Sequence, residues 1–317
     1  MTEAFFIMLR NVLVFVLLAV PGFLLVKLGL IKDKESGVLS KLLTYVGVPF
    51  LVLSSSLNIS FDGEIVKNIL IVALVGVAFT VGIFFLSALA TKPKEGEDKK
   101  RGMARFCMMF SNNGFLGIPL AQAVFGPSLV LTYLIILNIV TNLLIFTLGV
   151  YLISGDRSKI SLKKALLTPV LISFVVAIVL NLLKVVDYVP EVGTYASHFS
   201  NLVTPLSMII LGIKMAGVKF KDIFSKGSLY FVSVGKLLVV PALAVLLTFL
   251  LKWAFGFETD IIVGFFIAFA MPTAGLSSTL SDRYDGDTEN AVAYTLGTTL
   301  FSIVTIPLLY WLLLLLI

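Results

Sequence analysis

Two short runs of helix-breaking and amide-bearing residues interrupt apolar segments, and their residue types suit the binding of a small ligand. The runs contain Asn112, Asn113, Gly114 and Pro119 in one segment, and Pro272, Thr273 and Gly275 in another. Proline removes a backbone donor and clashes with the preceding turn, whereas Gly and Asn tolerate unusual backbone dihedrals. We therefore expect helix breaks at 112–114, at 117–119 and at 272–275. Bare N–H groups at the start of a half-helix suit an anion.

Polar side chains inside other apolar segments are further candidates for a binding site. Asn138 and Asn142 lie four residues apart, and so on one helix face, and Ser302 lies in a final segment rich in Thr and Ser. Such side chains either line a cavity or join helices through hydrogen bonds. The sequence leaves both interpretations open.

Lys236 is the basic residue placed deepest in an apolar segment. It is expected roughly 13 Å from the segment's start, at 1.5 Å per helical residue. An ionised Lys at this depth costs about 3 kcal/mol, so it either has a function or extends to the membrane surface. Our hypothesis is that Lys236 supplies a fixed positive charge where related folds place a coupling cation.

The composition indicates a membrane protein rather than a soluble one. Soluble chains carry about a quarter charged residues, whereas this chain of 317 residues has 13% charged and 59% hydrophobic residues. Cys107 and His198 are each the single residue of their type, which argues against a disulfide framework or a metal cluster. We expect no enzyme activity, because the apolar segments contain no paired aspartates and no His-Glu-x-x-His motif. We likewise expect no metal, no cofactor and no nucleic-acid partner.

Ten apolar segments, each about the length that crosses a bilayer, follow one another along the chain. We number them as spans 1 to 10, and they cover 4–30, 38–57, 66–91, 102–125, 128–153, 165–186, 196–216, 228–251, 259–281 and 288–316. Most of the 24 basic residues lie in the connectors after spans 1, 3, 5 and 7. Positive connectors stay in the cytoplasm. We therefore expect a multi-pass protein of the cell membrane with both termini on the extracytoplasmic side.

The two halves of the chain repeat one pattern. Residues 1–153 and 165–317 each hold five spans, and residues 154–164 form a short cytoplasmic linker. An odd number of spans makes the second repeat enter the membrane from the opposite side. Spans 4 and 9, which occupy matching places, are the interrupted ones, and paired interruptions in inverted repeats indicate a transporter's binding site. The predicted fold class is an all-α integral membrane protein, built as two inverted five-helix repeats with crossing broken helices.

The motifs at the interruptions resemble those of the auxin efflux carrier family, which includes bacterial malate-permease-like members. The resemblance is carried by residues 110–120 (FSNNGFLGIPL), 271–275 (MPTAG) and the stretch from Ala291 to Pro307. It implies the fold of bile-acid symporters and sodium/proton antiporters, with spans 1, 2, 6 and 7 as a dimerising scaffold. Spans 3–5 and 8–10 would form a core that slides like an elevator. It also implies that Asn112 contacts a substrate carboxylate and that Pro272 is the second crossover proline.

Two departures from the plant members bear on the substrate. Ser111 stands where the plant proteins have a proline before the asparagine, and the long central loop of many of them is replaced by residues 154–164. These departures favour a small carboxylate such as malate over an indole-type substrate.

The sequence therefore predicts a secondary transporter of small organic anions, malate-like or auxin-like carboxylates, in a lipid bilayer. The resemblance adds a homodimer, and either a sodium ion or a proton remains open as the coupling ion. The alternatives are a channel for a small ligand and a sensor or receptor built on a transporter fold.

Overall fold

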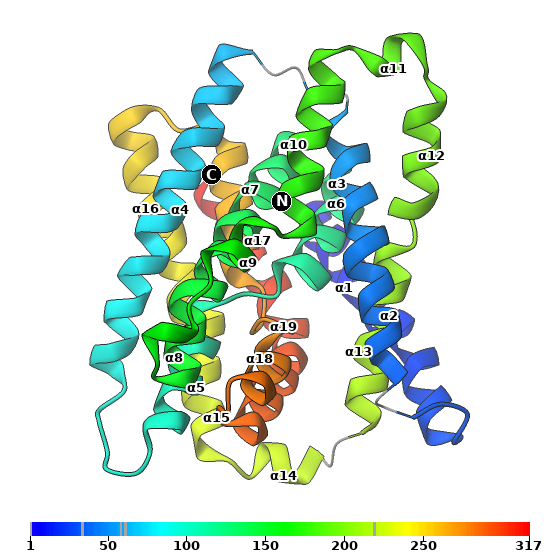
Figure 1. Cartoon of the computed structure of the whole chain (residues 1–317). Coiled ribbons are helices and arrows are strands. Elements are labelled where there is room, and N and C mark those ends of the chain that lie inside the picture. Colours follow the sequence, from blue (N-terminus) through cyan, green and yellow to red (C-terminus); the bar gives the residue numbers. More distant parts are fainter. Residues whose placement is uncertain (1, 33–34, 58, 60–61, 218–219) are drawn as a thin grey trace.

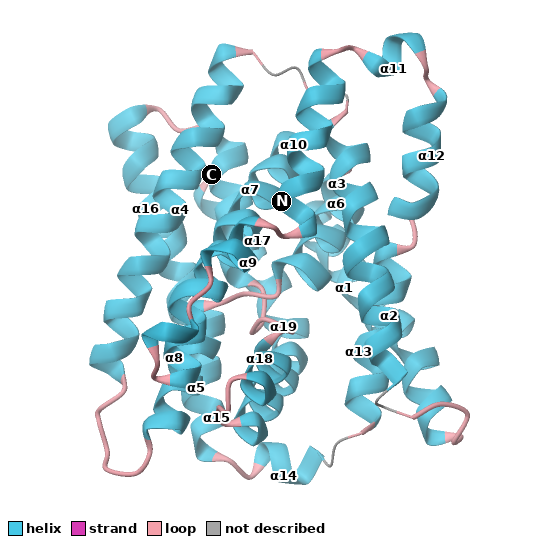
Figure 2. Cartoon of the chain, in the orientation of Figure 1, coloured by secondary structure: helices cyan, strands magenta, loops and turns pink. Residues whose placement is uncertain are grey.

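The computed structural model describes residues 2–32, 35–57, 59, 62–217 and 220–317. Over these residues the fold is helical, apart from one isolated β-bridge between Ser111 and Thr273 (Figures 1 and 2). Seven of the described helices are long and apolar enough to cross a membrane, and three shorter apolar helices lie at 113–125, 169–182 and 259–270. The prediction of an all-α, multi-pass membrane protein is confirmed at this level.

The first half of the chain contains the helices of the first five predicted spans. They are α1 (Thr2–Lys27), α2 (Ser36–Leu42), η2 (Leu43–Gly47), α3 (Val48–Ser56), α4 (Gly63–Ala90), α5 (Asp98–Met109), η3 (Asn113–Gly117), α6 (Ile118–Phe125), α7 (Leu129–Leu144), η4 (Ile145–Gly149) and α8 (Val150–Ser154). The observed bounds of α4 and of α7–α8 lie within three residues of the predicted spans.

The second half follows a short connector. Its elements are η5 (Arg157–Lys159), α9 (Leu162–Leu166), α10 (Pro169–Leu182), α11 (Val185–Tyr188), α12 (Glu191–Ser200), α13 (Val203–Ala216), α14 (Phe220–Phe224), α15 (Gly227–Val234), η6 (Gly235–Val239), α16 (Val240–Phe255), α17 (Thr259–Ala270), α18 (Ser277–Arg283) and α19 (Thr288–Leu316). The loop between α4 and α5, and α14, lie at the lower end of Figure 1, whereas both termini lie in its upper half.

Several long helices begin at a side-chain cap. Asp62 accepts hydrogen bonds from the backbone N–H groups at the start of α4, and Asp287 does the same for α19. Ser128 and Thr168 cap α7 and α10 through their hydroxyl groups. Each cap satisfies a backbone donor that has no partner inside the helix, so the polar residues before the apolar segments set where these helices start.

Three π-helical turns each end two residues before a proline. Turns η2, η3 and η6 precede Pro49, Pro119 and Pro241, respectively. A proline in a regular α-helix clashes with the carbonyl four residues earlier, and the wider turn, with its i→i+5 bonding, relieves that clash. The predicted break at 117–119 is therefore wrong: Pro119 lies inside a helix that runs from Asn113 to Phe125.

The helices α1 and α13 pack with their backbones unusually close together. A Cβ atom on Gly212 would lie 1.9 Å from the Ala19 carbonyl oxygen, and one on Gly22 would lie 2.1 Å from the Ile209 carbonyl oxygen. Only glycine permits this approach, as in other membrane helix pairs with small residues at the interface. The α1–α13 pair is thus a tightly fixed unit beside the broken helices.

Candidate functional site

The two interrupted helices meet at their breaks. The Asn112 N–H donates to the Pro272 carbonyl at 2.8 Å, and the Ala274 N–H donates to the Phe110 carbonyl at 2.9 Å. These two bonds flank the antiparallel bridge between Ser111 and Thr273. Unwound backbone inside a membrane requires such partners, so each break satisfies the other. We call this arrangement the crossing.

Hydroxyl groups satisfy further backbone groups at the crossing. The Thr273 hydroxyl donates to the Cys107 carbonyl in the last turn of α5 at 2.9 Å, and the Thr273 N–H donates to Thr298 Oγ1 at 3.2 Å. Both threonine side chains are fully buried. Thr273, predicted as a site residue, therefore joins the α17–α18 break to both α5 and α19.

Lys236 lies against the crossing. Its side chain is fully buried, and its Nζ donates to Ser111 Oγ at 2.5 Å and to the Phe269 carbonyl at 3.4 Å. Phe269 is in the last turn of α17, so the ammonium faces the negative end of a half-helix dipole. The burial of Lys236 excludes the interpretation in which its side chain extends to the membrane surface, and its functional role stays a prediction.

A cluster of amide side chains lies beside the start of the second half-helix. Asn113 Nδ2 donates to Thr141 Oγ1 at 3.5 Å, and Asn142 Nδ2 donates to Asn138 Oδ1 at 3.3 Å. A Cβ atom on Gly114 would lie 3.8 Å from Asn138 Oδ1. The structure thus brings four predicted site residues, Asn113, Gly114, Asn138 and Asn142, into one neighbourhood.

Two atoms of this amide cluster have no hydrogen-bond partner among the described residues. They are Asn113 Oδ1 and Asn138 Nδ2, on side chains that are 1% and 3% exposed. A buried polar atom without a partner costs about 1–3 kcal/mol. An unpaired acceptor and an unpaired donor beside a helix start can form hydrogen bonds with a ligand's polar group or with an ordered water.

The glycines at the breaks do not need left-handed backbone. Neither Gly114 nor Gly275 is among the positive-φ glycines of the described residues. The sharp change of direction is made by Asn112, with φ −80° and ψ 56°. Backbone at the crossing is extended through the bridge and then enters the next helix directly, which requires no left-handed residue. A Cβ atom on Gly275 would lie 3.6 Å from the Asn112 amide.

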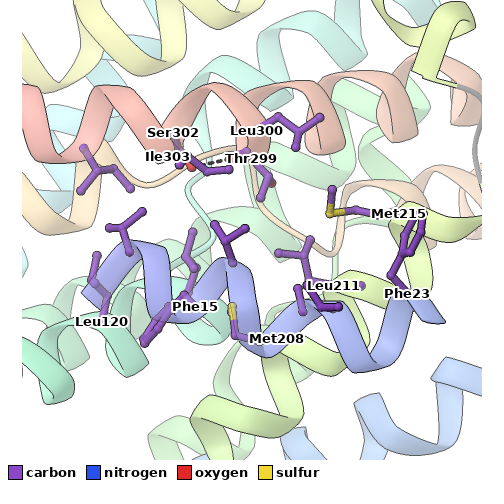
Figure 3. Close-up of a pocket in the computed structure, with 17 residues that line it drawn as sticks. Phe15, Phe23, Leu120, Met208, Leu211, Met215, Thr299, Leu300, Ser302 and Ile303 are labelled. Atoms are coloured by element: carbon purple, nitrogen blue, oxygen red, sulfur yellow. Dashed lines mark hydrogen bonds between the residues drawn. The ribbon is translucent and has the colours of Figure 1, made fainter. Parts of the chain in front are cut away.

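An apolar cavity of about 170 Å³ lies next to the crossing (Figure 3). It is lined by side chains of α1, α13, η3–α6 and α19, among them Phe15, Met208 and Leu120, with Thr299 and Ser302 as its hydroxyl-bearing residues. The Ser302 hydroxyl donates to the Thr299 carbonyl at 2.7 Å within its own helix. Ser302 therefore lies at the cavity, whereas Asn112 and Thr273 are not among the lining residues.

Ser111 and Thr298 are two crossing residues that the sequence did not predict as part of the site. Each supplies a hydroxyl oxygen to a donor at the crossing: Ser111 accepts from Lys236 Nζ, and Thr298 accepts from the Thr273 N–H. A signal for them exists: a hydroxyl in or opposite a break is a ready partner for backbone groups that the break exposes. Among the described residues, no group of three or more His, Cys, Asp or Glu side chains is arranged to hold a metal ion.

Two family models match successive parts of the chain. Residues 6–162 match the family described as "Membrane transport protein", and residues 202–317 match the "Sodium Bile acid symporter family". These matches confirm the resemblance to auxin efflux carriers and to the bile-acid symporter fold.

Curated relatives match nearly the whole chain. An "Uncharacterized transporter" of Methanothermobacter thermautotrophicus is 27% identical over 300 residues, which are 94% of this chain and 95% of the relative. An uncharacterized transporter of Methanocaldococcus jannaschii is 26% identical over 311 residues, which are 96% of this chain and 98% of the relative. Together with the family matches, these similarities support membrane transport as the general function.

Proposed function

We propose that this membrane transport protein is a secondary carrier of small organic anions that works by an elevator-type movement. The observation that carries the proposal is the crossing, where two broken helices bond to each other next to the buried Lys236. In the proposed topology, ten spans form two inverted repeats, residues 1–153 and 165–317, joined by the linker 154–164. The end of the molecule that holds the α4–α5 loop and α14, which we call the Lys-rich end, is then cytoplasmic. The resemblance favours a homodimer.

The packing of the helices favours a division into two bodies. Helix α1 packs against α13, and α3 packs against α10 and α12. The α2–η2 segment joins these two groups, and we assign all of them to a scaffold. Helices α4, α5, α7, α15–α16, α17 and α19 pack among themselves, and with α6, α8 and α18 they form the proposed moving core. Between the bodies, α1 packs against α19 and α6, where the apolar cavity lies. The contact between the two bodies is apolar at this cavity, so few hydrogen bonds would have to break there when the core slides against the scaffold.

The start of the η3–α6 helix is the proposed anion site. The first turn of a helix leaves backbone N–H groups without intrahelical partners, and its dipole contributes about half a positive charge. Asn112 lies at this start and is partly exposed, and the unpaired amide atoms of Asn113 and Asn138 lie nearby. The proposed substrate-binding set is Asn112, Asn113, Gly114, Pro119, Asn138, Asn142, Pro272, Thr273, Gly275 and Ser302.

The role proposed for Lys236 is electrostatic support rather than direct substrate contact. Its ammonium donates to a carbonyl at the end of α17, where a half-helix dipole is negative. A bound cation at this place would have the same effect on the backbone carbonyls. We therefore propose that Lys236 supplies the charge that a coupling sodium ion supplies elsewhere, which leaves a proton or no ion as the coupling partner.

The apolar cavity favours a monocarboxylate with an apolar body over a dicarboxylate such as malate. Engineered apolar cavities of about 150 Å³ stay dry and bind benzene, and the volume here is about 170 Å³. A second carboxylate placed among these side chains would lose its hydration without gaining a charged partner. Leu116, on the turn that begins at Asn113, lines the cavity and connects it with the proposed anion site.

A counterflow assay in proteoliposomes tests the proposed function. Vesicles containing purified protein are preloaded with an unlabelled acid, and uptake of the labelled acid is followed for phenylacetate, 3-methylbutanoate and malate. A carrier gives saturable uptake that the internal acid accelerates, and Asn112→Ala should abolish it while the exposed Asn201→Ala should not. Flux without acceleration would indicate a channel, and binding without flux would indicate a sensor; either result would refute the carrier.

A further inference from the structure

A second and larger cavity, of about 590 Å³, opens at the Lys-rich end of the molecule. It lies between the end of α4, the start of α5, the start of α15 and the start of α19. Its basic lining residues are Lys92, Lys94, Lys100, Arg101 and Lys226. We call it the basic cavity. The residues of the crossing and of the apolar cavity do not line it, so it is separate from the proposed transport site.

Positive charge exceeds negative charge in the basic cavity. Its five basic residues face three acidic ones, Glu97, Asp287 and Glu289. Glu289 pairs with Lys226 at 2.7 Å, whereas Glu97 is shared by Lys94 and Lys100 at 3.5 Å each. A carboxylate shared at this distance leaves both ammonium groups available to a second anion.

Arg101 is held in place by neutral groups. Its Nε donates to the Thr91 carbonyl at 2.8 Å, and its Nη2 donates to the Ala88 carbonyl at 3.4 Å. These bonds orient the guanidinium without cancelling its charge, and the fork geometry of Arg leaves further N–H donors for a phosphate. The guanidinium of Arg101 is thus a cation of the cavity that is oriented by neutral carbonyl groups and not by a carboxylate.

The start of α15 adds backbone donors to the same cavity. Its N-cap residue, Lys226, makes no side-chain cap hydrogen bond, and Ser228, at the second helical position, lines the cavity. The helix continues through η6 and α16 to Phe255, so its dipole is that of a long helix. In the described part of the chain, the Gly227 and Ser228 N–H groups have no side-chain cap, and uncapped N–H groups at a positive dipole end favour an anion with several acceptor oxygens.

An apolar strip leads from the basic cavity along α15. Phe231 lines the cavity and is 49% exposed, and Val234 and Leu238 continue the same helix face at 51% and 42% exposure. In a bilayer this strip faces acyl chains while the lysines lie at the headgroup level. Clusters of basic residues next to the membrane end of a helix bind anionic headgroups.

We propose that the basic cavity binds the phosphate group of an anionic ligand, either a membrane lipid headgroup or a soluble polyphosphate. The phosphate oxygens contact Arg101, the lysines and the uncapped start of α15. The ligand then joins the end of α4 to the starts of α15 and α19, three parts of the proposed core.

Thermal unfolding of the full-length protein in nanodiscs tests this proposal and separates the two sources. The lipid arm compares phosphatidylcholine discs with discs that contain phosphatidic acid. The soluble arm adds pyrophosphate to phosphatidylcholine discs, with sodium sulfate at matched ionic strength as the reference. The test variant is Lys92→Gln with Lys100→Gln, and the control is Lys159→Gln with Lys163→Gln, two exposed lysines that do not line the cavity.

At least one phosphate-bearing probe should stabilise the protein, and the cavity variant should bind it about 30-fold more weakly because two basic residues near the surface are lost. The control variant should keep the wild-type response. Stabilisation by phosphatidic acid alone identifies a lipid ligand, and stabilisation by pyrophosphate alone identifies a soluble one. If neither probe stabilises the protein beyond its reference, or if both variants lose the response equally, the proposal is wrong.

Discussion

Lys236 and Ser111 are joined by a 2.5 Å hydrogen bond from Nζ to Oγ, although they are 125 residues apart in the sequence. The bond connects η6 to the break between α5 and η3. It places the charge of one proposed repeat at the broken helix of the other.

Replacement of Lys236 by Met should abolish transport or change its ion dependence. Met keeps a similar side-chain length but removes the charge that faces the α17 carbonyls, and it leaves the Phe269 carbonyl without its side-chain donor. Initial uptake rates in proteoliposomes, with imposed sodium and proton gradients, measure both effects. Lys252→Met, near the end of the same long helix, is the control. Unchanged uptake with unchanged ion dependence would remove Lys236 from the mechanism.

Replacement of Ser111 by Ala should destabilise the protein, because the buried ammonium loses its hydroxyl acceptor. A hydrogen bond to a charged group contributes about 1.5–3 kcal/mol, so the loss should be visible in thermal unfolding. Ser111→Thr keeps the hydroxyl and suits extended backbone, and it should retain most of the stability. Equal unfolding temperatures for the Ala and Thr variants would mean that the bond to Lys236 contributes little.

Gly212→Ala should destabilise the scaffold by about 1–3 kcal/mol, the usual range for overpacking. The new methyl group would lie 1.9 Å from the Ala19 carbonyl oxygen and would force α1 and α13 apart. Gly82→Ala, on α4, is the matched control because a Cβ atom there meets nothing within 4 Å. Chemical unfolding in detergent micelles compares the two, and a loss at Gly82 as large as that at Gly212 would contradict the explanation.

Leu211→Phe should narrow the apolar cavity from the α13 side and select against bulky substrates. Leu211 lines the cavity, so the added ring volume should lower uptake of phenylacetate more than uptake of 3-methylbutanoate. The ratio of the two uptake rates is the measured quantity. Leu250 lies on α16 and is 56% exposed, so Leu250→Phe should leave the ratio unchanged. A ratio unaffected by Leu211→Phe would place the substrate body outside this cavity.

The helices could be predicted from the sequence because a membrane imposes one strong rule on them. Long apolar segments bounded by polar caps must be helical, and α4 and α19 accordingly lie close to their predicted spans. The break at Pro272 was also predictable, since proline lacks the donor that a continuous helix requires. Pro119 has the same chemistry but lies in a helix, because the π-helical turn η3 absorbs the clash. Local sequence does not distinguish these two outcomes.

The contacts at the crossing were less predictable than its location. Ser111 and Thr298 act through partners that are distant in the sequence, and such pairings depend on how the half-helices are rotated. The shared helix face of Asn138 and Asn142 followed from their spacing, whereas their proximity to Asn113 depends on how two helices pack and was not predicted. The apolar cavity is formed by α1, α13 and α19 together, and no single segment carries a signal for it.

Under the proposed elevator-type movement, the buried ammonium at the crossing has a consequence for the response of transport to membrane voltage. The four half-helix ends carry about half an elementary charge each, two positive and two negative, and so nearly cancel. A protonated Lys236 adds one positive charge at the crossing of the empty core, where its printed partners are a hydroxyl and a carbonyl, and a bound monoanion cancels that charge. A potential of 100 mV changes the free energy of each elementary charge that crosses the whole membrane field by about 2.3 kcal/mol. An inside-negative potential would therefore act on the return of the empty core and draw it toward the cytoplasm, which favours net export of the anion.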